Sequence, residues 1–104
     1  MSGRCTGCDG LVVAAIIRLC RCTVPPDPAD PQTVSALRRI TTKAIRCELA
    51  VMTLRNIPTA AVTAILRKLG IRYVRGGGGN TTRLAADKEN VEKIRREMLT
   101  LIES

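Results

Sequence analysis

The chain has 104 residues, a net charge of +8 and 45% apolar residues, with Tyr73 as its only aromatic side chain. This length suits one small domain with an aliphatic core and leaves little room for a second core. Because histidine is absent and no nucleophile–base pair can be identified, we predict that the chain is not an enzyme and takes no small-molecule substrate.

The positive charge is concentrated in the middle of the chain. Residues 1–30 sum to zero, residues 31–48 to +3 and residues 87–104 to −1. Residues 49–86 contain no acidic residue, and their basic residues are Arg55, Arg67, Lys68, Arg72, Arg75 and Arg83. Since a carboxylate would repel phosphate, an acid-free stretch of this length indicates a surface that binds a polyanion.

The first predicted helix covers residues 10–22, with Asp9 as its cap, although its β-branched residues also allow a strand. Its apolar run, 11–17, is too short to span a membrane, and Arg18 follows it directly, unlike a signal peptide. We therefore predict an intracellular protein, cytoplasmic or nucleoid-associated, with reduced thiols. Arginine outnumbers lysine 13 to 4, which indicates either a thermophile or GC-rich coding.

Four of the five prolines lie in residues 23–31, which predicts an irregular connector. Residues 32–56 are helical in pattern, either as one helix or as two helices broken at Thr41-Thr42, where two β-branched residues are adjacent. The apolar stripe of this stretch consists of Leu37, Ile40, Ala44, Cys47, Val51 and Leu54, widened by Ile45, Leu49 and Met52.

A shorter helix is predicted over residues 56–70, with Pro58 and Thr59 at its start and Gly70 at its C-terminal cap. Residues 71–75 and 81–86 both alternate as strands do, so the four glycines between them are predicted to close a hairpin. These glycines match neither a Walker-type loop nor a dinucleotide-binding fingerprint.

The last predicted helix covers residues 88–103, capped by Asp87 and with Glu89 in its first turn. Its a/d positions are occupied by Val91, Ile94, Met98 and Leu101. This apolar stripe packs either on the chain's own domain, which we favour, or against a second copy to form a homodimer.

The order of helix, turn, helix, basic hairpin and closing helix resembles a winged helix-turn-helix domain over residues 32–103. The stretch "CELAVMTLRNIPTAAVTAILRKLGI" resembles the positioning and recognition helices, and "RYVRGGGGNTTRLAA" resembles the wing. The fold class is then α+β, mostly α with a small β-hairpin, following an N-terminal arm and connector over residues 1–31. The family's first helix lies either within the cramped residues 32–42 or at residues 10–22.

The resemblance also implies which residues contact DNA. On the recognition helix these are Thr59, Ala60, Thr63, Arg67 and Lys68. At the wing, phosphate contacts are implied for Arg72, Arg75, Gly76, Gly77, Gly78, Gly79, Asn80 and Arg83. Small residues early in a recognition helix allow its backbone to approach base edges closely, and a tip without side chains can approach sugar and phosphate.

Five cysteines raise the question of a metal. Cys5 and Cys8 form a CxxC pair, and Cys20 and Cys22 form a CxC pair. A helix over residues 10–22 would separate the two pairs by roughly 15 Å, too far for one zinc or iron–sulfur site. We therefore predict no metal or other cofactor and place Cys47 in the core; a disulfide from Cys47 to Cys20 or Cys22 is an alternative.

These observations predict a duplex-DNA-binding protein, a transcriptional regulator or chromatin-associated factor. The lack of aromatic residues argues against stacking on single-stranded bases. The alternative is a winged helix that binds protein or RNA as a subunit of a polymerase or ribosomal assembly.

Overall fold

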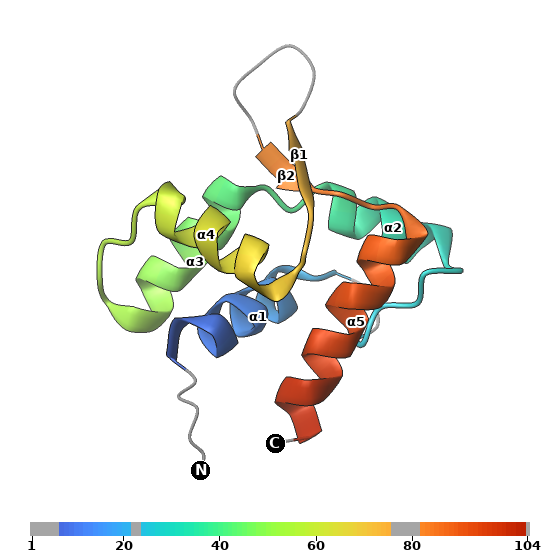
Figure 1. Ribbon diagram of the computed structural model, residues 1–104, viewed down its shortest axis with the longest axis horizontal. Coiled ribbons are helices and arrows are strands. Elements are labelled where there is room, and N and C mark those ends of the chain that lie inside the picture. The colour runs from blue at the N-terminus through green and yellow to red at the C-terminus, as the bar shows by residue number, and fades with distance from the viewer. Residues whose placement is uncertain (1–6, 22–23, 76–81, 104) are drawn as a thin grey trace.

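The computed structural model describes residues 7–21, 24–75 and 82–103, which form five α-helices and one two-stranded antiparallel sheet (Figure 1). The predicted α+β class, mostly helical with a small hairpin, is confirmed. In chain order the elements are α1 (Gly7–Leu19), α2 (Pro31–Arg38), α3 (Thr42–Thr53), α4 (Thr59–Leu69), β1 (Tyr73–Arg75), β2 (Thr82–Leu84) and α5 (Lys88–Glu103).

The helix α1 is central to the core and is not a detached arm. Val12, Ala15 and Ile16 are fully buried, and α1 contacts α3, α4 and α5. Such a helix, apolar over most of its surface, is stable only when other elements surround it. The core therefore does not divide at residue 31. The helix also begins earlier than predicted, so Asp9 lies in its first turn and is not its cap.

Residues 31–53 form two helices, which settles the alternative left open by the sequence. Asp30 caps α2, since its Oδ1 accepts a hydrogen bond from the Gln32 amide at 3.1 Å. Thr41 caps α3 in the same way, with its Oγ1 accepting from the Ala44 amide at 3.0 Å. In a continuous helix the Ala44 amide would donate to the backbone carbonyl four residues earlier. Here it donates to the Thr41 side chain, so a new helix begins after Thr41.

The predicted apolar stripe does not continue through this break. On α3 the buried apolar residues are Ile45 and Leu49, whereas Cys47 and Val51 are exposed. The prediction that Cys47 lies in the core is therefore wrong. The non-helical residues between α2 and α3 reset the helical phase, so the buried position of Leu37 does not predict which face of α3 is covered.

The helix α4 ends at Gly70 as predicted, in a left-handed conformation with φ 81°. The chain then enters the hairpin, in which Tyr73, Val74 and Arg75 pair with Leu84, Arg83 and Thr82 respectively. The predicted pairing is confirmed, although both strands are shorter than expected. The four glycines and Asn80 lie outside the described residues.

The hairpin is also joined to the connection between α2 and α3. Thr41 forms an isolated antiparallel bridge with Arg83, and the Leu84 amide donates to the Ile40 carbonyl at 3.0 Å. The single residue Thr41 thus acts as a minimal third strand. Because of this bridge, the start of α3 lies directly beside β2.

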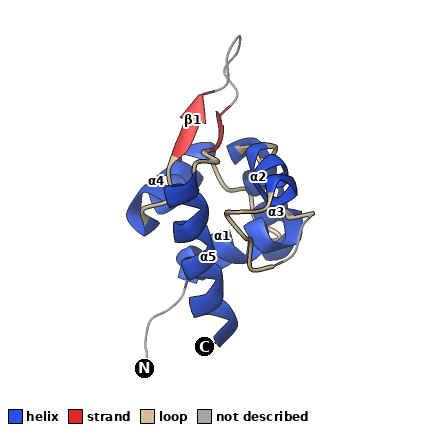
Figure 2. Ribbon diagram, turned by 90° about the vertical axis from the view of Figure 1, so that its right-hand side faces the viewer, coloured by secondary structure: helices blue, strands red, loops and turns tan. Residues whose placement is uncertain are grey.

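The helix α5 has the predicted limits, and Asp87 caps it by accepting from the Asn90 amide at 3.3 Å. Val91, Ile94 and Met98 are buried in the chain's own core, as we favoured. The stripe proposed for a dimer is therefore largely covered within the chain. Figure 2 shows the C-terminal half of α5 at the opposite end of the molecule from β1. No helix in the described part of the chain has the length and apolar character needed to cross a membrane.

Candidate nucleic-acid interface

A cleft lies where three elements meet beside the hairpin. It is lined by Thr41, Thr42, Lys43, Arg46, Pro58, Thr59 and Thr82. These residues come from the start of α3, the start of α4 and the strand β2. Figure 1 shows the first turns of both helices on the side of the molecule from which the hairpin projects.

The cleft is electropositive for two independent reasons. The first turns of two helices border it, and a helix N-terminus carries a partial positive charge and amides without helical partners. The N-cap of α4 is Pro58, which makes no side-chain hydrogen bond to the following amides. Lys43 and Arg46 add two full charges, and none of the lining residues is acidic. The cleft can therefore hold an anion such as a phosphate group.

One face of the hairpin is on the same side as the cleft. Tyr73 and Arg75 share a face of the sheet with Thr82 and Leu84, because residues two apart point the same way and paired residues lie side by side. Leu84 is buried and Thr82 lines the cleft, so exposed Arg75 lies at the outer end of the cleft-facing side. Arg83, which pairs with Val74, is on the opposite face.

The helix α4 carries a continuous polar stripe from the cleft to the hairpin. Thr59, Thr63 and Arg67 are spaced by four residues and so share one face. Arg67 Nη2 donates to the Tyr73 hydroxyl at 2.8 Å, which fixes the guanidinium at the base of the hairpin. Ala60 is exposed beside the stripe, and the Thr63 hydroxyl donates to the Ala60 carbonyl at 3.1 Å.

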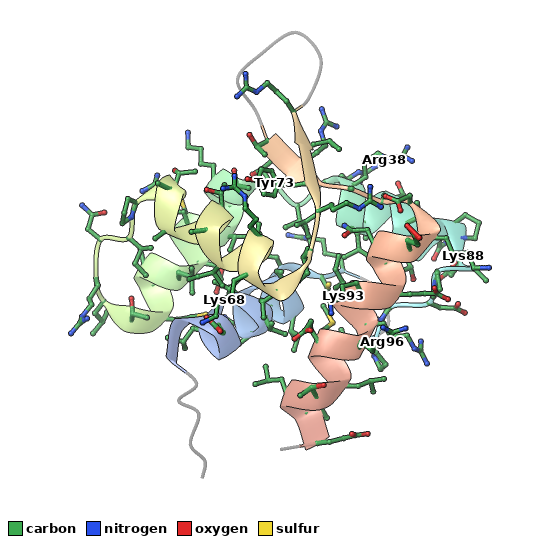
Figure 3. All side chains as sticks on the ribbon, viewed as in Figure 1. Arg38, Lys68, Tyr73, Lys88, Lys93 and Arg96 are labelled. Carbon is green, nitrogen blue, oxygen red and sulfur yellow. The ribbon has the colours of Figure 1, made fainter. Side chains whose placement is uncertain are left out.

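Two predicted contact residues lie elsewhere and are paired with carboxylates. Lys68 Nζ is 3.1 Å from Asp9 Oδ2, and Figure 3 shows Lys68 beside α1. Arg72 forms an ion pair with Asp87 at the start of α5. Each of these cations is therefore partly neutralised and separated from the cleft.

Sequence reasoning missed the two cations that line the cleft, Lys43 and Arg46. They belong to residues 31–48, which appeared less basic than the acid-free stretch that follows. The sequence signal for these two cations is Thr41-Thr42. A helix that begins at Thr42 places Lys43 and Arg46 in its first turns. There the cations and the free amides of the helix N-terminus together favour a bound anion.

The cysteines are described only in part. Cys5 and Cys22 lie outside the described residues, Cys8 is near the start of α1, and half-buried Cys20 follows its end. Cys8 and Cys20 are thus separated by about 18 Å along the helix. Within the described residues, no three cysteine, aspartate or glutamate side chains come together as metal ligands, and Cys20 and Cys47 form no disulfide with each other.

Comparison with protein-family models, with curated proteins and with solved structures finds no match to this chain.

Proposed function

We propose that the chain is a winged helix-turn-helix protein that binds duplex DNA. The order α2, Thr41 bridge, α3, α4, β1, β2 corresponds to the helix, strand, helix, helix, strand and strand of that family. In this assignment α2 is the family's first helix, α4 is the recognition helix and the hairpin is the wing. The helix α1 fills the core behind them.

The observation that carries the proposal is the cleft with two helix N-termini and two cations. A phosphate of the DNA backbone seated there meets Lys43, Arg46 and the first amides of α3 and α4. Such a contact carries no sequence information, but it fixes the position and direction of α4 on the duplex.

Base contacts then come from the polar stripe of α4. With a phosphate in the cleft, Thr59, Ala60 and Thr63 lie next along the helix, and their small side chains allow close approach to base edges. Arg67 is held by Tyr73 and suits a guanine or a further phosphate. Arg75 reaches the backbone from the hairpin.

The test is a salt titration of duplex binding, measured by fluorescence anisotropy. For about four to six phosphate contacts, log K should fall against log salt with a slope of about −4 to −5. Arg46→Ala should make the slope shallower by about one, since one phosphate contact is lost. The matched control is Arg96→Ala on α5, a helix that contributes no residue to the cleft, and it should leave the slope unchanged.

Two results would overturn the proposal. One is a slope near zero, and the other is an effect of Arg46→Ala no larger than that of Arg96→Ala. The comparison of duplex DNA, duplex RNA and single strands at matched salt separates the proposal from a role in protein or RNA binding. If Arg67→Ala leaves duplex DNA binding intact, that other role is favoured.

A further inference from the structure

The outward face of α3 is apolar. The residues Ala44, Cys47, Val51 and Leu54, here called the α3 seam, are spaced by three, four and three residues. This spacing places Ala44, Cys47 and Val51 along one side of the helix, opposite the buried residues Ile45 and Leu49, and Leu54 follows as the residue that ends the helix.

The α3 seam is open to solvent in the single chain. Cys47 is exposed, Val51 is 65% exposed and Leu54 is 90% exposed. A helix that is apolar on its core side and on its outer side is typical of one covered from both sides. An exposed leucine would normally be unremarkable, but three adjacent seam positions form a continuous apolar strip.

Leu54 also adopts a backbone conformation that leucine rarely takes. It is the C-cap of α3 with φ 57° and ψ 34°, in the left-handed region where glycine is usual. Glycine at this position would end the helix with less strain and without an exposed apolar side chain. The leucine is therefore unfavourable for the isolated fold on two counts, which points to a contact made by its side chain.

We infer that the α3 seam binds a second copy of this chain, with the two α3 helices parallel. The spacing of Ala44, Cys47 and Val51 is the a, d, a pattern of a two-stranded coiled coil, and Leu54 extends the apolar strip from the C-cap, next to where the following d residue would lie. A β-branched residue at a followed by leucine at d favours two parallel strands.

The flanking charges agree with a parallel pair. In this register Lys43 occupies a g position and Glu48 the following e position, which are the two positions that meet across a parallel dimer. Lys43 of one copy therefore faces Glu48 of the other, and the next such pair joins Ala50 to Arg55. No like charges face each other at these positions. Glu48 is also paired with Arg18 of its own chain through Oε2, so in the dimer its carboxylate would be shared between Arg18 and the second copy's Lys43.

The inferred dimer stands independently of the proposed DNA binding, although both use Lys43. Because the helices are parallel, the first turns of both α3 helices lie at the same end of the pair. Each cleft includes that first turn, so both clefts lie at that end of the pair. With only four seam residues per chain, the interface is small, and we expect it to be in rapid exchange between monomer and dimer.

The test is sedimentation velocity without DNA, over protein concentrations of about 1 to 200 µM. The weight-average mass should rise from the 11.3 kDa of one chain toward twice that value. Val51→Glu places a charge at an a position and should weaken association at least about tenfold. Leu54→Asn should also weaken it, since asparagine tolerates the left-handed conformation but removes the apolar contact. Ile102→Glu on α5, at a position that is 55% exposed, is the control.

A crosslink reports the direction of the helices. When diamide oxidises two thiols, parallel helices place the two Cys47 side chains face to face, so a disulfide dimer should form and should be absent from Cys47→Ser.

Circular dichroism verifies that Val51→Glu and Leu54→Asn keep their helical content. A chain that stays monomeric at the highest concentration, or a dimer unaffected by both variants, overturns the inference. A dimer that gives no Cys47 crosslink overturns the parallel arrangement, and association only with a different protein assigns the seam to that partner instead.

Discussion

The side chain of Asn90 holds the base of the hairpin to α5, and its removal should destabilise the fold strongly. Asn90 is only 2% exposed. Its Oδ1 accepts from the Arg72 amide at 2.6 Å, and its Nδ2 donates to the carbonyls of Arg72 and Ala85 at 2.9 and 2.7 Å. One amide group thus joins the residue before β1 to the residue after β2. The perturbation is Asn90→Ala, which deletes all three hydrogen bonds.

The size of the effect follows from what each partner retains. The Arg72 carbonyl still accepts from the Ala85 amide at 3.1 Å, so its loss is small. The Arg72 amide and the Ala85 carbonyl lose the Asn90 side chain, and each unsatisfied buried group costs about 1 to 3 kcal/mol. Because Arg72 is at an exposed position, water can replace part of what its amide loses, so we take the lower half of that range, about 3 kcal/mol in total. This is a large share of the roughly 5 to 15 kcal/mol expected for a domain of this size.

Thermal unfolding followed by circular dichroism measures the effect. A loss of about 3 kcal/mol should lower the Tm by roughly 10 to 20 °C. The control is Arg96→Ala, an exposed change on the same helix, which should alter stability by about 0.5 kcal/mol or less. If the Tm of Asn90→Ala falls no further than that of Arg96→Ala, the Asn90 amide contributes no more to stability than an exposed side chain does. The claim that its hydrogen bonds stabilise the fold is then wrong.

Three further predictions concern helix ends, each measured by the Tm at low protein concentration. Thr41→Val removes the hydroxyl that accepts from the Ala44 amide and should cost about 1 kcal/mol; an unchanged Tm would mean that water replaces the cap. Gly70→Ala should cost about 1 to 2 kcal/mol because φ is 81°, with little added by the nearby Lys93 side chain, which can move aside. Leu54→Gly should instead raise stability by about 0.5 to 1 kcal/mol while lowering the dimer fraction; a lower Tm would show that the leucine stabilises the monomer.

The elements that the sequence predicted well are those with strong local signals at both ends. Pro58 and Gly70 bracket α4, and Asp87 begins α5 with its side chain on the Asn90 amide. The hairpin followed from alternation on both sides of the glycines. Each signal acts through groups a few residues apart, so the rest of the fold does not alter it.

The elements that the sequence predicted poorly depend on contacts between distant residues. The buried face of α3 could not be read by extending the stripe from Leu37, because the cap at Thr41 interrupts the helix. The bridge from Thr41 to Arg83 joins residues 42 apart in the chain, and it brings β2 beside the start of α3, where the cleft lies. The paired state of Lys68 likewise required the position of Asp9, which lies in the first turn of α1 and which we predicted to precede that helix.

Whether a cation of the candidate interface is neutralised depends on which carboxylates the fold places beside it, more than on the composition of its own stretch of sequence. Residues 49–86 contain no acid, yet Lys68 and Arg72 are paired with acids that α1 and the start of α5 bring to them. Residues 31–48 look less basic, but their one acid, Glu48, is paired with Arg18 on α1. Lys43 and Arg46 have no ion pair within the described part of the chain, so in the single chain both charges are available at the cleft. The fold thus places two cations without an intrachain ion pair at the start of α3, where helix amides reinforce their charge.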